Sequence, residues 1–596
     1  YRITRSGLDW EIPEPENPWS NIGYWNDHQI IYLCKLLELQ NQLDPEALKD
    51  LLNKALFTTA NIPYHIKTYN DVEKNPRDTI VFDYDLNDKI TKDQTKYGTD
   101  AKLMNKDGNP YLVTLTSKLL QLVLTKLANF VPGGGIWLNT QRPEWNDANN
   151  ALAGYGLSMV TTSYLRRMLN FLKEIYSSTE NDSFDIPKTE KEFFNNIKSI
   201  YAKTKPEDTQ TEKGRAEFTR ACGTAFEKER KAFYKDYALL KKTTSLKKDE
   251  LLSAIDIFME HLEYSIKLNK KENGLYHSYN TLAISKDGMK VEYLQEMLEG
   301  QVAVLSSKML SSKEILELYN SLKNSGMYEK RQHSYMLYPT KELPDFIAKN
   351  IVPKSDAQKF SLLKNELDKN YTAPDSTCIV YNDSIDSTVC HFNPDFRNAE
   401  VLSNALNSKN IDAEQKEGIL ALYEATFHHS SFTGRSGTFY AYEGLGSIYW
   451  HMVSKLLLAI QENFDIADDS SAEKAELAKA YYEVRNGLGF NKTPELYGAF
   501  PTDPYSHTPS GQGAKQPGMT GQVKEEVITR WGELGIKLTN GKLCFKPDLL
   551  CKKEFGEDGT LAFTRFGVPF TYKLNSSATT CSINVGGQTL TPTLDG

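Results

Sequence analysis

Apolar residues recur at helical spacing along most of this chain, and this pattern restricts the fold more than any other feature. Clear cases lie at residues 30–37, 112–130 and 251–266. Side chains three or four positions apart share one face of a helix, so each run predicts a helix with one buried face. Clusters of proline and glycine, such as the one at 131–135, separate the runs. The sequence therefore predicts a mainly α-helical protein.

Two segments depart from this pattern. From about residue 541, short runs of alternating polarity, such as 561–566, lie between Gly, Asp and Asn turns, which is typical of β-strands. We therefore expect a small β module at 541–596. The stretch at about 177–248 is dense in Lys, Glu, Asp and Thr, and we interpret it as a charged, solvated helical insertion.

Composition excludes several classes of protein. No apolar run approaches the roughly 20 residues that cross a bilayer, so a membrane-embedded protein is excluded. The chain has 70 basic and 78 acidic residues, and its net charge of −8 gives no reason to expect a nucleic-acid partner. The 7 cysteines are scattered and lack the paired spacing of metal sites, which predicts reduced thiols, no metal and a cytoplasmic protein.

The most informative local pattern is the run of polar residues at 142–150. It combines Arg142, Glu144, Trp145, Asn146 and Asp147 with further amides, and it follows the glycine-rich loop at 133–135. The tryptophan could stack on a sugar ring while amides and carboxylates bind hydroxyl groups, and one protonated carboxyl could donate to a glycosidic oxygen. The alternative is a helix N-terminus capped by Asn or Asp. We favour ligand binding, because a cap needs neither the tryptophan nor the arginine.

A second aromatic, amide and acid group occurs near the start of the chain. It comprises Tyr24, Trp25, Asn26, Asp27 and His28, directly before the apolar run at residue 30. Asp27 could equally be the N-cap of that helix. Two such groups, each at the head of a helix, would make sense if both lined one opening.

Two later segments could complete such an opening. Glycines flank Glu443, which allows a ligand to approach the backbone closely, and His451 follows. His451 could bind an anion or accept a proton, although a lone histidine is more often structural. The loop that includes Thr520 and Gly521 precedes a helix, where backbone amides could hold a phosphate.

In this order, the four elements resemble the cellobiose-phosphorylase-like glycoside phosphorylases, and the resemblance covers most of the chain. That family has an (α/α)6 barrel, usually preceded by a large β-sandwich and followed by a small one. The resemblance implies an (α/α)6-barrel catalytic domain at 1–540 and a β-sandwich module at 541–596. Because the chain opens at Tyr1 without an initiator methionine, we expect that an N-terminal β-sandwich is missing, which could provide a homodimer interface.

The resemblance also implies roles for individual residues. The family's Gly-Asp-Trp-Asn-Asp matches 143–147, which places the general acid on Asp147, and a barrel-helix segment is echoed at 299–306. Together with neighbouring polar groups, the candidates are Asp147, Glu443 and Glu144 for catalysis; Tyr24, Trp25, Asp27, His28, Arg142, Trp145, Asn146, Glu299 and Gln301 for the sugar; and His451, Thr520, Gly521 and Arg435 for phosphate.

The sequence departs from the family at two positions. Trp25 stands where the family has a sugar-binding arginine, and Ala151 lies near the place of an arginine that helps to hold phosphate. Arg142 or Arg435 could substitute for the second arginine. These departures bear on which reaction the chain catalyses.

Three hypotheses follow. The first is an inverting phosphorylase that cleaves β-glucosidic bonds of oligosaccharides, with phosphate as nucleophile and co-substrate and no other cofactor. The second is an inverting hydrolase, or a transglycosylase, on the same barrel, in which a carboxylate such as Glu443, Asp27 or Glu299 activates water. The third is a carbohydrate-binding protein without activity, which the two missing arginines motivate.

Overall fold

The computed structural model describes residues 27–59, 63–98, 101, 105–106, 109–139, 152, 154–340, 344–375, 377–428, 446–517, 522–574, 583–585 and 588–590. This part of the chain is mainly α-helical, with 20 α-helices and short antiparallel strands. None of its helices combines the length and the apolar character needed to cross a membrane.

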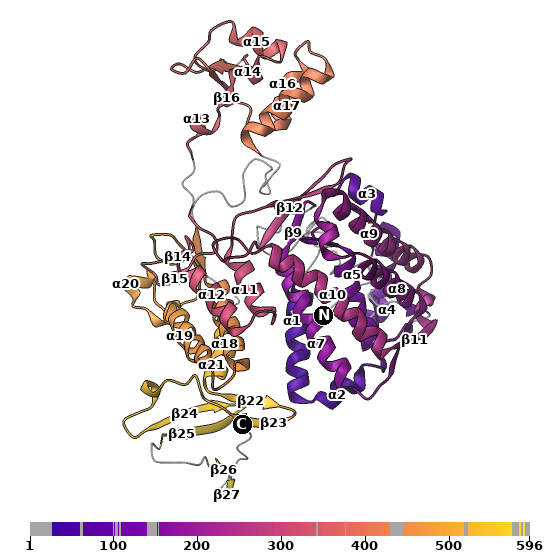
Figure 1. The fold of residues 1–596 in the computed structure, drawn as a ribbon, viewed down its shortest axis with the longest axis vertical. Coiled ribbons are helices and arrows are strands. Elements are labelled where there is room, and N and C mark those ends of the chain that lie inside the picture. The colour runs from indigo at the N-terminus through magenta and orange to yellow at the C-terminus, as the bar shows by residue number, and fades with distance from the viewer. Residues whose placement is uncertain are drawn as a thin grey trace.

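The first group of helices packs around one large hydrophobic core (Figure 1). It comprises α1 (Asp27–Leu43), α2 (Pro45–Leu51), α5 (Leu115–Ala128), α7 (Met159–Ser178), α8 (Lys188–Lys203), α9 (Glu212–Lys235) and α10 (Lys248–Leu268). Helix α3 (Tyr69–Lys74) packs in a smaller cluster with Trp137, and α4 (Tyr84–Tyr97) contributes no residue to the large core. Helices α1, α5 and α10 confirm the three apolar runs predicted from the sequence. Every residue of α5 is buried, which explains why its sequence is apolar on several faces.

The predicted insertion at 177–248 forms α8, α9 and the strand pair β10 (Ser183–Pro187) and β11 (Thr243–Lys247). Its aromatic residues Phe193, Phe194 and Tyr201 are buried in the same core as α1, α5 and α7. The charged residues of α8 therefore cover an apolar face that belongs to the main body.

A second group of helices surrounds another core. It comprises α11 (Leu298–Ser306), α12 (Ser312–Lys323), α18 (Trp450–Ile466), α19 (Ala472–Asn486) and α20 (Pro494–Tyr497), and α21 (Gln522–Glu533) packs against α18. Figure 1 shows the two groups side by side, with α1 and α7 of the first group next to α11 of the second. The helices that meet at this boundary carry the candidate site.

Short antiparallel sheets connect the helices. The largest has the order β13-β12-β9-β8-β7 and another has the order β19-β20-β21. Their strands are β7 (Phe130–Val131), β8 (Gly135–Trp137), β9 (Gly156–Ser158), β12 (Tyr279–Ile284), β13 (Met289–Tyr293), β19 (Ser447–Tyr449), β20 (Tyr505–Pro509) and β21 (Lys515–Pro517). The other strands of the body are β1 (Ala55–Phe57), β2 (Tyr64–Ile66), β3 (Ile80–Phe82), β4 (Asn105–Lys106), β5 (Asn109–Pro110), β6 (Val113–Thr114), β14 (Tyr328–Glu329) and β15 (Ser334–Tyr335).

Residues 344–428 form a smaller unit with a core of its own. In Figure 1 it lies at the upper end, away from both groups of helices. It contains α13 (Phe346–Lys349), β16 (Val352–Pro353), α14 (Lys354–Ala357), α15 (Ser361–Leu367), β17 (Val380–Asn382), β18 (Val389–Phe392), α16 (Ala399–Asn407) and α17 (Ala413–Phe427). Buried residues such as Phe392, Leu402 and Tyr423 meet between the helices and the three-stranded sheet.

The C-terminal residues form β-hairpins, as the alternating pattern predicts. They are β22 (Ile536–Thr539) with β23 (Lys542–Phe545), β24 (Thr560–Arg565) with β25 (Val568–Lys573), and β26 (Ile583–Val585) with β27 (Gln588–Leu590). Positive φ angles of 53° at Phe566 and 73° at Gly567 close the middle hairpin. The rings of Phe545 and Phe570 lie 6.2 Å apart and link two hairpins. The (α/α)6 barrel and the β-sandwich remain predictions.

Candidate functional site

The candidate residues from the sequence precede or begin five helices that are neighbours in space. The groups at 24–28, 142–147, 299–301, 443–451 and 520–521 lead into α1, α7, α11, α18 and α21 respectively. Helix α7 packs against α1 and α11, and α18 packs against α11 and α21. Segments that are far apart in the sequence are therefore brought together by the packing of the helices that follow them.

These helices run in the same direction. Tyr32, in the second turn of α1, and Lys524, in the first turn of α21, are joined by a 2.8 Å hydrogen bond. Deeper in the bundle, Arg167 of α7 bonds Glu38 of α1 and Glu462 of α18. Because residues at similar distances from the N-termini meet, the N-termini lie at one end of the molecule. The positive ends of their dipoles gather there, which favours the binding of an anion.

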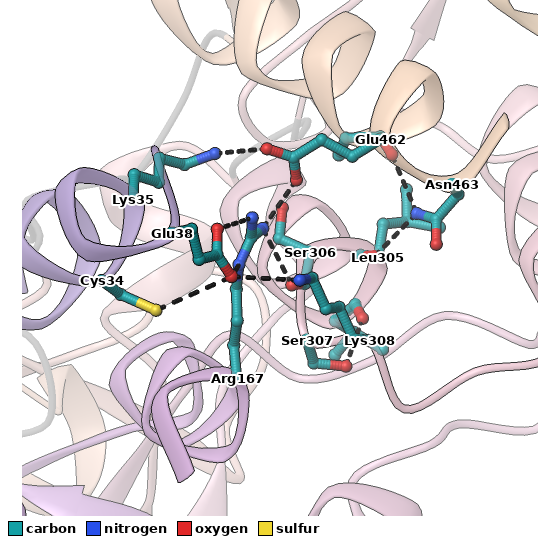
Figure 2. A network of polar contacts seen from close by, with 12 residues as sticks. Cys34, Lys35, Glu38, Arg167, Leu305, Ser306, Ser307, Lys308, Glu462 and Asn463 are labelled. Carbon is teal, nitrogen blue, oxygen red and sulfur yellow. Dashed lines mark hydrogen bonds and ion pairs between the residues drawn. The ribbon is translucent and has the colours of Figure 1, made fainter. Parts of the chain in front are cut away.

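Arg167 is the centre of the polar network that joins α1, α7, α11 and α18 (Figure 2). Its Nη2 donates to Glu38 Oε2 and its Nη1 to Glu462 Oε2, each at 2.6 Å, and its Nε donates to Glu38 Oε1 at 3.0 Å. Lys35 Nζ donates to Glu462 at 2.7 Å, and Lys308 Nζ lies 3.1 Å from Glu38. The network fixes the relative positions of the helices whose N-termini carry the site.

Electrostatics explain why these groups are charged although they are buried. Burial by itself would raise the pKa of Glu38 and of Glu462, but Arg167 and nearby lysines lower both pKa values below the usual range. The same two carboxylates raise the pKa of the Arg167 guanidinium against the effect of burial. The network contains three cations and two carboxylates, so its net charge is positive.

His451 lies at the N-terminal end of α18 with its side chain 1% exposed. The hydroxyl of Tyr449 lies 3.4 Å from its Nδ1, and Glu525 Oε1 lies 3.9 Å from its Nε2. Burial lowers the pKa of His451, and Glu525 opposes this effect. The Tyr449 ring stacks on His507, with 4.9 Å between ring centroids.

Lysines of two helices surround the pair formed by His451 and Glu525. Lys524 Nζ lies 3.7 Å from Glu525 Oε1 and 4.0 Å from the centre of the Tyr32 ring. Lys455 lies one turn after His451 on α18, and its Nζ is 5.6 Å from the centre of the Tyr32 ring. This part of the site therefore combines a buried histidine, a buried carboxylate and two lysines, a set that suits an anionic ligand.

Glu299 and Gln301 lie on the same helix, but their surroundings differ. Glu299 is partly exposed at the start of α11, where the Tyr279 hydroxyl donates to its Oε2 at 2.8 Å. The charge of Glu299 also contributes to the raised pKa of Tyr449, after the larger effect of burial, which places Glu299 near His451. Glu299 is therefore placed where it could contact a ligand.

Gln301 is completely buried. Its amide nitrogen donates to the carbonyl groups of Tyr276 and Met297, and its Oε1 accepts from Tyr276 N. Both amide hydrogens are thus used to hold the turn before β12 against α11. The structure gives Gln301 this structural contact, in place of the sugar contact that the resemblance implies.

Most of the other candidates lie outside the described residues. These are Tyr24, Trp25, Arg142, Glu144, Trp145, Asn146, Asp147, Arg435, Glu443, Thr520 and Gly521. Asp27 and His28 are in the first turn of α1, and their side chains are also outside the description. The assigned roles of these residues stay predictions.

Hydrogen bonds join the residues on either side of the segment that carries Asp147. Gly154 N donates to Leu138 O at 2.7 Å, and the Trp137 indole donates to Gly154 O at 2.9 Å. A Cβ on Gly135 would lie 2.7 Å from the backbone of Ser158, the N-cap of α7, so only glycine allows this approach. Both ends of the segment are therefore fixed beside the N-terminus of α7.

Several residues of the site were not found from the sequence. They are Tyr32, Tyr279, Tyr449, Lys455, Lys524 and Glu525. The spacing of His451 and Lys455, four residues apart on one helix, is a signal that could have identified the lysine. Among the described residues, no group of three or more His, Cys, Asp or Glu side chains is placed to hold a metal ion.

Comparison with known families identifies the smaller unit. Residues 343–430 match the family described as GH149 phosphorylase insertion domain 2. The matched range coincides with the unit at 344–428 that packs around its own core. The match supports a glycoside phosphorylase. A comparison with curated proteins found no match.

Proposed function

We propose that this glycoside phosphorylase cleaves β-glucosidic bonds of oligosaccharides with inversion at the anomeric carbon. The insertion-domain match supports the enzyme class. The proposal depends mainly on one geometric observation, the convergence of five helix N-termini that are preceded by the candidate sugar and phosphate residues. His451 and its lysine neighbours lie at that end.

In the proposed mechanism, the carboxyl group of Asp147 donates its proton to the glycosidic oxygen. Phosphate attacks the anomeric carbon from the opposite face, the bond to the leaving sugar breaks, and its electron pair takes up the proton. The products are a sugar 1-phosphate and a shortened oligosaccharide. Because phosphate is itself the nucleophile, one acid suffices and no catalytic base is needed.

The charges of the site fit the phosphate. The positive helix ends, His451 and the lysines Lys455 and Lys524 would compensate the charge of a dianion before it attacks. The sequence lacks the arginine that the resemblance implies near Ala151. The two lysines would supply the positive charge in its place. The proposed co-substrate is therefore inorganic phosphate, with no other cofactor, and the proposed location is the cytoplasm.

The test is to incubate the protein with β-glucooligosaccharides with and without phosphate and to follow the anomeric protons by NMR. We expect α-configured sugar 1-phosphate that forms only with phosphate. Asp147→Asn should abolish turnover and leave the melting temperature unchanged. Equal cleavage without phosphate would favour the hydrolase or transglycosylase. Binding without any turnover, unchanged in Asp147→Asn, would favour the inactive binding protein.

A further inference from the structure

The side chain of Glu525 is buried next to the candidate phosphate residue His451. The two side chains are 3% and 1% exposed, and 3.9 Å separates Glu525 Oε1 from His451 Nε2. The other ring nitrogen, Nδ1, lies on the side of Tyr449, which is partly exposed and precedes α18. The imidazole therefore lies between a buried carboxylate and the end of the bundle where the helices begin.

Glu525 is kept ionised by its neighbours. Burial would raise the pKa of this carboxyl, but His451 and the lysines Lys35, Lys455 and Lys524 lower it below the usual value. A charged carboxylate accepts hydrogen bonds and cannot donate one. It thus favours a proton on the nitrogen that faces it.

We propose that Glu525 is a positioning residue whose negative charge, 3.9 Å from His451 Nε2, favours the protonated form of His451 and thereby its binding of phosphate. This inference rests on the proposed function, because it deepens the role given there to His451. Without the carboxylate, burial and the two lysines would lower the pKa of His451 unopposed, and a neutral ring offers the anion no positive charge. The carboxylate therefore acts on phosphate through the histidine, without touching it.

Other charged groups around His451 act in both directions. Tyr449 of β19 and Lys524 of α21 face it, and His507 of β20 stacks on the Tyr449 ring. Lys455 of its own helix lowers the pKa of His451, as does Lys524. Further titratable groups around this cluster include Tyr32 and Lys35 of α1, Tyr164 of α7 and Glu299 of α11. Among the described residues, Glu525 is the carboxylate that lies nearest to the His451 ring. Its charge opposes the effect of the two lysines on the pKa of His451.

The test compares Glu525→Gln with Glu526→Gln in the full chain. Glu526 is the next residue of α21, and its side chain accepts a hydrogen bond from Gln522 at 2.7 Å. Histidine rings labelled with ¹³C are titrated by NMR, and the His451 signal is identified by its loss in His451→Asn. The KM for phosphate and the KM for oligosaccharide are measured over the same pH range.

In Glu525→Gln we expect the His451 titration to move to lower pH by about 1–3 units, the effect of losing a nearby opposite charge. At pH values above the shifted His451 titration, the KM of the variant for phosphate should be at least about tenfold higher than that of the wild type. Its KM for oligosaccharide should stay the same. Glu526→Gln should change neither quantity. Glu525→Asp keeps the charge and should titrate close to the wild type, which provides the test if the glutamine variant does not fold.

An unmoved His451 titration in Glu525→Gln would overturn the inference. A shifted titration with an unchanged KM for phosphate would overturn the link to phosphate. If the wild-type protein forms no sugar 1-phosphate, the proposed function fails instead, and the NMR titration still decides whether Glu525 controls the charge of His451.

Discussion

Glu299 shows how a single carboxylate can be placed by residues that a sequence pattern does not reveal. The start of α11 is held by Ser278, whose Oγ accepts from Gly300 N at 2.8 Å and donates to Met297 O at 3.0 Å. A Cβ on Gly300 would lie 2.3 Å from that oxygen, so the glycine allows the contact. The orientation of Glu299 therefore depends on the preceding hairpin.

We expect Tyr279→Phe to weaken oligosaccharide binding without unfolding the protein. The substitution removes the hydroxyl that donates to Glu299, and losing a hydrogen bond to a charged group costs about 1.5 kcal/mol, or about tenfold in KM. Steady-state kinetics on both substrates measure the effect. Tyr293→Phe in the same sheet, where the side chain is exposed, is the control. An unchanged KM for oligosaccharide would argue against a sugar contact by Glu299.

At the residue scale, the sequence predicts chemistry better than placement. Asp, Glu, His and Trp in a polar run indicated a ligand site, and His451 does lie among charged groups. Gln301 shows the limit, because the same residue type can bind a sugar or hold a backbone turn. Only the tertiary partners Tyr276 and Met297 distinguish the two possibilities.

At the scale of elements, the Arg167 network links the helices that carry the site. We predict that Arg167→Met lowers the free energy of unfolding by about 3–5 kcal/mol, because it leaves Glu38 and Glu462 buried without their main partner. Chemical denaturation measures the change. Lys173→Met removes a partner of Asp256 from an exposed ion pair and should cost at most about 1 kcal/mol. Similar costs for both variants would contradict the central role of Arg167.

The elements themselves were largely predictable. Apolar periodicity identified α1, α5 and α10, and alternation identified β24 and β25. The core of residues 344–428 was not predicted as a separate unit, because its helices have the same periodicity as those of the main body. Periodicity shows which face of a helix is buried, but the helix it packs against depends on contacts between distant residues.

For the molecule as a whole, the separate core of residues 344–428 predicts independent unfolding of this unit. Phe392 is completely buried there, and its replacement by alanine should destabilise the unit by about 3–5 kcal/mol. In the full-length Phe392→Ala variant, hydrogen exchange should be faster than in the wild type within residues 344–428. The protection of α7 and α18 should be unchanged. Faster exchange in those helices as well would mean that the chain unfolds as one cooperative unit.

Four buried or partly buried histidines predict acid sensitivity of the whole molecule. Burial lowers the pKa values of His65, His261, His277 and His451 from the usual 6.5. The unfolded chain then binds more protons than the folded one, so stability falls as pH drops below about 6.5. The melting temperature should decrease from pH 7 to pH 5, and less steeply in His261→Gln. A melting temperature that rises over this range would contradict the prediction.

The central claim is that the common N-terminal end of α1, α7, α11, α18 and α21 is the phosphorylase site. It can be tested by determining a crystal structure of the protein soaked in phosphate. The claim predicts a tetrahedral anion in contact with His451, between the first turns of α18 and α21. Phosphate bound elsewhere in the molecule, with no anion beside His451, would contradict it.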